Sequence, residues 1–130
     1  MFSNTNAFSS FSVDDVPAAR KFYGETLGIN VSDEDESGIL FLHVAGDRDV
    51  FVYPKDTHEP ASFTILNFPV DDVEATVESL TERGVSFERY EGTETETDEK
   101  GVFRGGGPLI AWFKDPAGNV LSVIDANADT

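Results

Sequence analysis

The sequence contains few side chains of the types that act as nucleophiles or general bases at neutral pH. It has two histidines and no cysteine. Without cysteine, disulfides, thiolate metal sites and cysteine nucleophiles are excluded. His43 ends an apolar run and is either a partly buried histidine with satisfied hydrogen bonds or a general base, with Tyr53 as a second acid–base candidate. His58 stands in a proline-flanked acidic segment and is expected at the surface. No serine–histidine–aspartate motif is recognisable, because the sequence has no nucleophile elbow.

One arginine stands directly before a run of glycines. Arg104 precedes Gly105-Gly106-Gly107 in a chain with only 9 basic residues. It either binds a ligand carboxylate or neutralises neighbouring acids. The glycines lack a following Lys-Ser/Thr pair and a helix, so they are not a phosphate loop. They predict either a mobile lip over a binding site or a bulged hairpin.

The elements that position these side chains are indicated by an internal repeat. The segment Phe11–Val16, which reads FSVDDV, returns as FPVDDV at Phe68–Val73. In each copy an apolar run leads in, and a helix-like stretch that ends at a glycine leads out. Such a repeat decides the architecture. Two copies are too few for a solenoid, so we expect two βα-type modules that share one core.

In the first module we expect strands at 6–13, 29–33, 38–45 and 49–54, with a hairpin turn at 45–48. The helix follows the first strand. Asp14 or Asp15 is expected to cap it, Pro17 suits its first turn, and Gly28 suits its end. Its apolar residues fall at helical spacing: Val16, Ala19, Tyr23 and Leu27.

In the second module we expect strands at 61–68, 85–90, 108–114 and 119–125, the last two joined by a turn at 115–119. A helix is expected from about residue 72 to 83, with Gly84 as its stop and with Val73, Val77 and Leu80 as its apolar stripe. Residues 91–100 carry no apolar side chain, which predicts a solvated loop.

Each module therefore has the order β-α-β-β-β, and the predicted fold class is α+β with two paired sheets. At 130 residues we expect a single domain, 1–130. Its first module covers about 6–54, its linker 55–60 and its second module about 61–125.

The net charge of −16 limits the partners. Such a field repels phosphate backbones and anionic lipids, so nucleic acid and membrane partners are not expected. The excess acid is either an ordinary acidic surface or an adaptation to high salt, and we favour the second because the acids are spread along the whole chain. No apolar run approaches the ~20 residues of a membrane span, and no signal peptide is recognisable. We therefore expect a cytoplasmic protein.

Together these motifs resemble the vicinal oxygen chelate superfamily, which includes glyoxalases, extradiol dioxygenases and fosfomycin- and bleomycin-resistance proteins. The resemblance rests on the duplicated Val-Asp-Asp motifs with Phe22-Tyr23, Leu27-Gly28, Gly84-Val85 and the segment 113–119. It implies paired βαβββ modules that form a curved mixed sheet around a cleft, often in a homodimer. The fold alone does not imply an activity.

Enzymes of that superfamily hold a divalent metal with His, Gln or Glu side chains on inward-facing strand positions. The resemblance places the corresponding positions at Phe8, Tyr53, Ile65 and Ser122. A phenyl ring and a butyl group have no lone pair to offer, and hydroxyls are poor substitutes for imidazole or carboxylate. We therefore expect no metal and no other cofactor.

The residues that are left to line the cleft are aromatic or neutral polar. Alternation from Phe8 places Ser10 and Ser12 on one face, and alternation from Ile65 places Asn67 there. The resemblance adds Phe41, His43, Phe51, Tyr53 and Trp112 as lining residues. The candidate ligand-binding residues are Ser10, Ser12, His43, Tyr53, Asn67, Arg104, Trp112 and Ser122.

The sequence thus predicts a metal-free, homodimeric protein that binds a small organic molecule. One alternative is an enzyme of lyase, dioxygenase or transferase type. It would use an atypical metal site of His43 and acidic loop residues, or metal-free acid–base chemistry through His43 and Tyr53. Another is a structural or regulatory module with a filled cleft.

Overall fold

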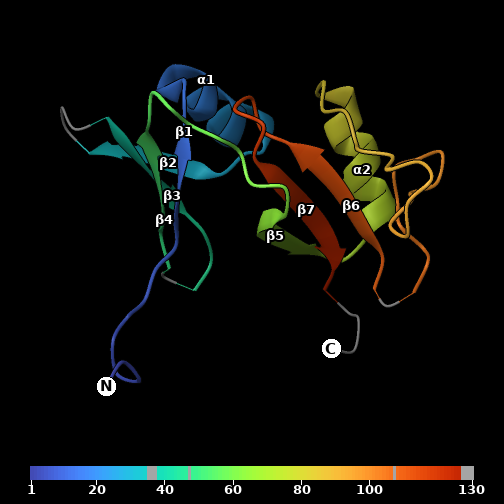
Figure 1. Ribbon diagram of the computed structural model, residues 1–130, viewed down its shortest axis with the longest axis horizontal. Coiled ribbons are helices and arrows are strands. Elements are labelled where there is room, and N and C mark those ends of the chain that lie inside the picture. Colours follow the sequence, from blue (N-terminus) through green and yellow to red (C-terminus); the bar gives the residue numbers. More distant parts are fainter. Residues whose placement is uncertain (35–37, 47, 107, 127–130) are drawn as a thin grey trace. The chain divides into compact units, whose positions relative to one another are not determined.

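The computed structural model describes residues 1–34, 38–46, 48–106 and 108–126 (Figure 1). The chain divides into two compact units, residues 1–59 and 60–130, each with its own sheet. Asp47 of the predicted hairpin turn and Gly107 of the predicted glycine lip lie outside the described residues. Within the described ranges, no helix is both long and apolar enough to cross a membrane.

In the residues that the structure describes, the first unit contains four strands and one helical stretch. Its elements are β1 (Ser10–Val13), α1 (Val16–Lys21), the π-helical turn η1 (Phe22–Thr26), β2 (Asn30–Glu34), β3 (Ile39–His43) and β4 (Val50–Pro54). The strand order is β1-β4-β3-β2, in which β1 runs parallel to β4 and the other pairs are antiparallel. The sheet is therefore mixed.

Local capping explains where α1 begins. The carboxylate of Asp15 accepts a hydrogen bond of 3.1 Å from the Ala18 N–H, and Pro17 lies in the first turn. Gly28 takes φ +72° after η1, a backbone conformation that glycine adopts without a steric penalty.

The helical stretch buries Ala19 and Tyr23 of the predicted stripe. The sheet adds further buried side chains to the core of this unit: Val13, Leu40, Leu42, Val50 and Val52.

Within 60–106 and 108–126, the second unit has the same order of elements with one strand fewer. Its elements are β5 (Thr64–Val70), α2 (Val73–Glu82), β6 (Ile110–Lys114) and β7 (Val120–Asp125). The sheet order is β5-β7-β6, with β5 parallel to β7 and β6 antiparallel to it. Helix α2 contacts β6 and β7. It buries Val73, Val77 and Leu80, as the sequence predicts.

These findings confirm the predicted α+β fold of two modules with mixed sheets, but one predicted strand is wrong. Residues 85–90 form only an isolated bridge, between Phe87 and Phe113. The segment alternates like a strand, yet Tyr90 takes φ +48° and ends the extended backbone. The carbonyls of Glu88 and Arg89 accept from Thr97, so the segment is tied to the following loop.

The predicted solvated loop at 91–100 also needs a correction, at Thr97. This residue is only 2% exposed, and its Oγ1 donates to the carbonyls of Glu88 (2.8 Å) and Arg89 (3.1 Å). Its neighbours at 91–96 are exposed, as expected. Burying a threonine costs little free energy when its hydroxyl is hydrogen-bonded within the protein. A count of apolar side chains therefore does not predict the burial of Thr97.

Candidate functional site

Three phenylalanines stack on one face of the first sheet. Phe41 and Phe51 are directly opposite in the β3–β4 register, with ring centroids 4.4 Å apart. Phe8 extends the stack, with its centroid 4.5 Å from that of Phe51, and is 60% exposed. Because strand residues alternate between faces, this aromatic row (Phe8, Phe51 and Phe41) lies on the face opposite to the buried Leu40 and Leu42.

A hollow of about 620 Å³ adjoins the aromatic row. Phe8 and Phe51 form part of its wall, and the Arg48 and Asp49 side chains bring both signs of charge to it. A hollow of this size is within the usual range for small-molecule sites, which combine aromatic walls with a few polar groups.

The predicted serines lie on the same face as the aromatic row. Ser10 pairs with Phe51 and Ser12 with Tyr53 in the parallel β1–β4 register. The Ser12 Oγ lies 2.6 Å from Nδ1 of His58. His58 is therefore half-buried and hydrogen-bonded, which corrects its expected place as plain surface. Strand β4 ends in a more open position, with Tyr53 38% exposed.

The two acid–base candidates, His43 and Tyr53, lie apart on the first sheet. From the Phe41–Phe51 pair, His43 lies two residues along the sheet in one direction and Tyr53 two residues in the other. That spacing separates the two by ~13 Å at ~3.3 Å per residue. The two side chains therefore do not contact each other directly.

His43 instead joins two residues that the sequence analysis missed. Its Nε2 lies 2.6 Å from Oγ of Ser32, and its Nδ1 lies 2.9 Å from Oδ1 of Asp49. Ser32 lies on β2, His43 ends β3 and Asp49 directly precedes β4. No sequence motif links the three, because the strand register brings them together. The available signal was the predicted hairpin, in which the strands 38–45 and 49–54 pair close to the turn and bring His43 near Asp49.

In the second unit, three predicted residues form one row across the sheet. Asn67 and Trp112 each pair with Ser122 in register. The fully buried Ser122 donates from Oγ to Oδ1 of Asn67 at 2.5 Å. The Trp112 Nε1–H donates to Oγ1 of Thr64 at 3.1 Å. The Ser122 hydroxyl and the Trp112 N–H thus have partners within the sheet, while Asn67 is exposed.

Trp112 is also flanked by two aromatic rings. The Tyr90 ring centroid lies 5.4 Å from that of Trp112, and the Phe103 centroid lies 5.8 Å from it. Burial, with a further contribution from the Glu88 carboxylate, raises the pKa of Tyr90 above its ordinary value, while the Lys114 ammonium opposes the shift. This aromatic cluster joins the 87–103 segment to β6.

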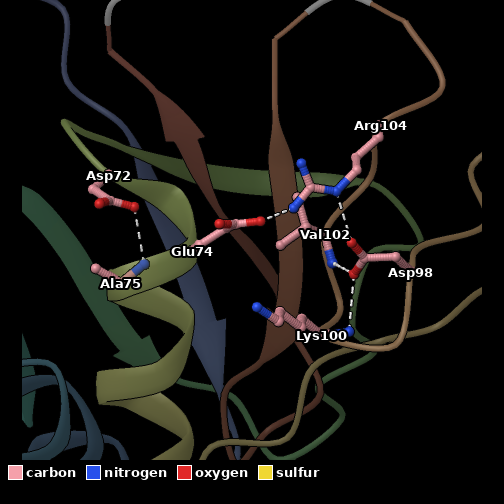
Figure 2. Close-up of polar contacts among 7 residues, drawn as sticks. All are labelled: Asp72, Glu74, Ala75, Asp98, Lys100, Val102 and Arg104. Carbon is pink, nitrogen blue, oxygen red and sulfur yellow. Dashed lines mark hydrogen bonds and ion pairs between the residues drawn. The ribbon is translucent and has the colours of Figure 1, made fainter.

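Arg104 is engaged with two carboxylates, as Figure 2 shows. Its Nε donates to Oδ2 of Asp98 at 2.7 Å, and its Nη2 pairs with Glu74 on α2. The other Asp98 oxygen accepts the backbone N–H groups of Lys100 and Val102, both at 2.9 Å. Of the two roles left open for Arg104, the structure shows the neutralisation of neighbouring acids.

The four positions of the superfamily metal site do not fit a metal ion. In the first unit they offer the stacked phenyl ring of Phe8 and the phenol of Tyr53. In the second they offer the butyl group of Ile65, at a register shift between Thr64 and Leu66, and the Ser122 hydroxyl, which is committed to Asn67. Elsewhere in the described ranges, no group of three or more His, Asp or Glu side chains is arranged to hold a metal. Divalent cations need several converging nitrogen or oxygen donors.

A sequence model described as "Glyoxalase/Bleomycin resistance protein/Dioxygenase superfamily" matches residues 7–123. The chain belongs to this superfamily. The match spans both modules of the glyoxalase/bleomycin resistance protein/dioxygenase fold, from just before β1 into β7. Membership agrees with the two sheets and two helices described above, and the resemblance predicted from the repeated motifs is confirmed.

Solved structures similar to this superfamily member include an antibiotic binding protein. TnmS3, the antibiotic binding protein from Streptomyces sp. CB03234, is 27% identical with a TM-score of 0.66, and the alignment covers 94% of this chain and 97% of that one. A glyoxalase/bleomycin resistance protein from the same organism is 28% identical with a TM-score of 0.60, covering 92% and 100% of the two chains. A putative glyoxalase family protein from Bacillus anthracis is 17% identical with a TM-score of 0.67, covering 96% and 98%, and it shows the fold alone. None of the curated proteins matches the chain.

Proposed function

We propose that this protein binds a small aromatic molecule, without a metal ion, on the aromatic row of the first sheet. The single observation that carries the proposal is the stack of Phe8, Phe51 and Phe41, exposed at Phe8 and half-buried at the other two rings, beside a hollow of about 620 Å³. A flat ring added to such a stack gains contact area and ring–ring attraction at little conformational cost.

Two further observations support a binding role. The positions that would hold the superfamily metal carry side chains that bind metals poorly or not at all, so the metal-dependent activities of the superfamily lack their donors. Among the structures more than 25% identical to this chain, TnmS3 is described as an antibiotic binding protein. A binding role for this chain is in keeping with that description, and the aromatic character of the ligand is inferred from the row alone.

Isothermal titration calorimetry against a panel of planar aromatic compounds tests the proposal. At least one compound is expected to bind the wild type with micromolar or better affinity and to lose at least tenfold in affinity in Phe51→Leu. Phe63→Leu is the matched control, because Phe63 is 68% exposed and outside the row. If no compound binds, or if both variants weaken binding equally, the proposal is wrong.

We also propose that the protein works as a homodimer and is adapted to high salt. The superfamily resemblance implies a homodimer, and the net charge of −16 suits a solvent rich in screening cations. Analytical ultracentrifugation in molar KCl tests the first point, with a single species of twice the chain mass as the expected result. A sedimentation coefficient of a monomer at all concentrations would overturn it.

A further inference from the structure

Ser32, His43 and Asp49 form a continuous hydrogen-bonded chain on the first sheet. The Ser32 Oγ lies 2.6 Å from Nε2 of His43, whose Nδ1 lies 2.9 Å from Oδ1 of Asp49. We propose that these three residues form a nucleophilic site at which Ser32 accepts the acyl group of aromatic esters. This inference goes beyond binding, because it requires a bond to form and break.

The order of the atoms determines where the protons lie. An ionised carboxylate only accepts hydrogen bonds, so the 2.9 Å contact with Asp49 places the imidazole proton on Nδ1. Nε2 then carries a lone pair, and the Ser32 hydroxyl donates to it. This is the arrangement in which a histidine can remove the serine proton while an aspartate holds the ring in the required tautomer.

Three neighbouring segments of one sheet hold the group in place and leave it accessible. Ser32 lies on β2, His43 ends β3, and Asp49 directly precedes β4. The His43 and Asp49 side chains are 33% and 39% exposed, and Ser32 is half-buried. A substrate therefore reaches Oγ without opening the core. Groups held on strands are placed more reproducibly than groups held on loops.

The surroundings of Ser32 favour an aromatic substrate. Phe41 is directly opposite Ser32 in the β2–β3 register, and its ring stands edge-to-face with the His43 imidazole at a centroid distance of 6.5 Å. Phe41 also stacks on Phe51. An aromatic group resting on these rings would have its ester carbonyl within reach of the serine.

The reaction balances without a further reactant except water. The Ser32 oxygen attacks the ester carbonyl carbon as its proton passes to Nε2 of His43. The bond from that carbon to the leaving oxygen then breaks, and His43 returns the proton to the released alcohol or phenol. Water repeats the sequence on the acyl-serine with His43 as base. Ester and water thus yield acid and alcohol, with no change of oxidation state.

The test uses 4-nitrophenyl benzoate and a fluorophosphonate probe on the full chain, followed by peptide mass spectrometry. We expect a single adduct at Ser32, together with release of 4-nitrophenol. In Ser32→Ala both should disappear, and in His43→Gln both should fall at least tenfold. Ser79→Ala is the matched control, because Ser79 is an exposed serine on α2, and it should behave as the wild type. Adducts at other residues only, or turnover unchanged in Ser32→Ala, would overturn the inference.

Asp49 is a positioning residue, so its test needs a readout besides turnover. The ¹⁵N chemical shifts of the His43 ring report which nitrogen carries the proton. The wild type should show the proton on Nδ1, and Asp49→Ala should shift the population toward Nε2 and lower the labelling rate at least tenfold. An Nε2-protonated ring in the wild type would contradict the proposed order of atoms.

The tests distinguish failure of the nucleophilic site from failure of the binding proposal. Calorimetry on Ser32→Ala measures ligand binding when no reaction can occur. Intact binding without Ser32 labelling overturns only the nucleophilic site. Labelling without measurable affinity for any aromatic compound overturns only the binding proposal.

Discussion

Phe41 and Phe51 stack directly across the β3–β4 register, with their ring centroids 4.4 Å apart and their planes inclined by 24°. Phe8 reaches the other side of Phe51 from the segment that precedes β1. Phe51 is therefore the middle ring of the row and contacts both neighbours. Any role of this face in binding depends first on that ring.

Replacing the middle ring should affect both stability and binding. Phe51→Ala removes two ring contacts, each worth roughly 0.5–1.5 kcal/mol beyond burial, so unfolding should become easier by about 1–3 kcal/mol in addition to the effect of the lost burial. Urea denaturation followed by circular dichroism measures this. Phe63→Ala, at an exposed position, should change stability by no more than about 0.5 kcal/mol. Equal effects of the two substitutions would contradict the described stacking.

Asp98 should contribute more to the free energy of unfolding than the neighbouring ion pair between Arg104 and Glu74. Its Oδ1 accepts the N–H of Val102, a residue with no exposed surface (Figure 2). Asp98→Ala leaves that buried donor without its partner, which costs about 1–3 kcal/mol. Glu74→Gln removes only a half-exposed charge beside Arg104 and should cost less than about 1 kcal/mol. A larger loss in Glu74→Gln, by urea denaturation, would reverse this ranking.

Metal removal should have no effect on the protein. The superfamily positions offer Phe8, Tyr53, Ile65 and Ser122, none of which carries an imidazole or a carboxylate. Protein purified without chelator should contain far less than one Zn, Mn, Fe or Ni ion per chain by mass spectrometry. EDTA should leave the melting temperature and ligand affinity unchanged. One tightly bound ion per chain would refute this expectation.

Stability should rise with salt. The carboxylates behind the net charge of −16 repel one another, and this repulsion weakens as the Debye length falls from ~30 Å at 0.01 M to ~3 Å at 1 M. The melting temperature should therefore increase between millimolar and molar KCl. Sucrose is the control for general exclusion effects, since it stabilises without screening. A melting temperature independent of KCl would argue against adaptation to salt.

Ionisation of Tyr90 should lower the free energy of unfolding at alkaline pH. Its pKa is raised from 10.0 in the folded state by burial and Glu88, so the folded protein holds the phenol proton more tightly than the unfolded chain. The resulting stabilisation is complete below pH 10.0 and is lost as the pH rises through the folded-state pKa. Tyr90→Phe should remove this step from urea denaturation measured between pH 9 and 12.

The neighbours of Tyr90 provide an independent check of the same shift. Glu88→Gln should lower the Tyr90 pKa, and Lys114→Gln should raise it further, because the two charges act in opposite directions. Tyrosinate absorbance in a Tyr23→Phe, Tyr53→Phe background isolates this titration. Shifts in the same direction in both variants would contradict the described charges.

The parts of the fold that depend on local sequence were predictable. Asp15 and Asp72 occupy the same place in the two copies of the repeat, and each caps its helix by accepting from the N–H three residues on. The cap and the apolar spacing are encoded within a few residues, so the repeat identifies both helices.

Features that depend on non-local pairing were harder to predict. The strand expected at 85–90 fails because Tyr90 adopts a left-handed backbone and Thr97 competes for the carbonyls, and neither is visible in a hydrophobic pattern. The contacts of His43 with Ser32 and Asp49 follow from strand register alone. Alternation did place Ser10 and Ser12 with the aromatic row, because β1 is regular there.

Trp112 is the only tryptophan of the chain, and it lies between Tyr90 and Phe103, which flank the loop that Thr97 ties down. Light absorbed by Tyr90 can pass to the indole over so short a gap. The intrinsic fluorescence of Trp112 therefore reports whether that loop is packed against β6. The measurement needs no added dye.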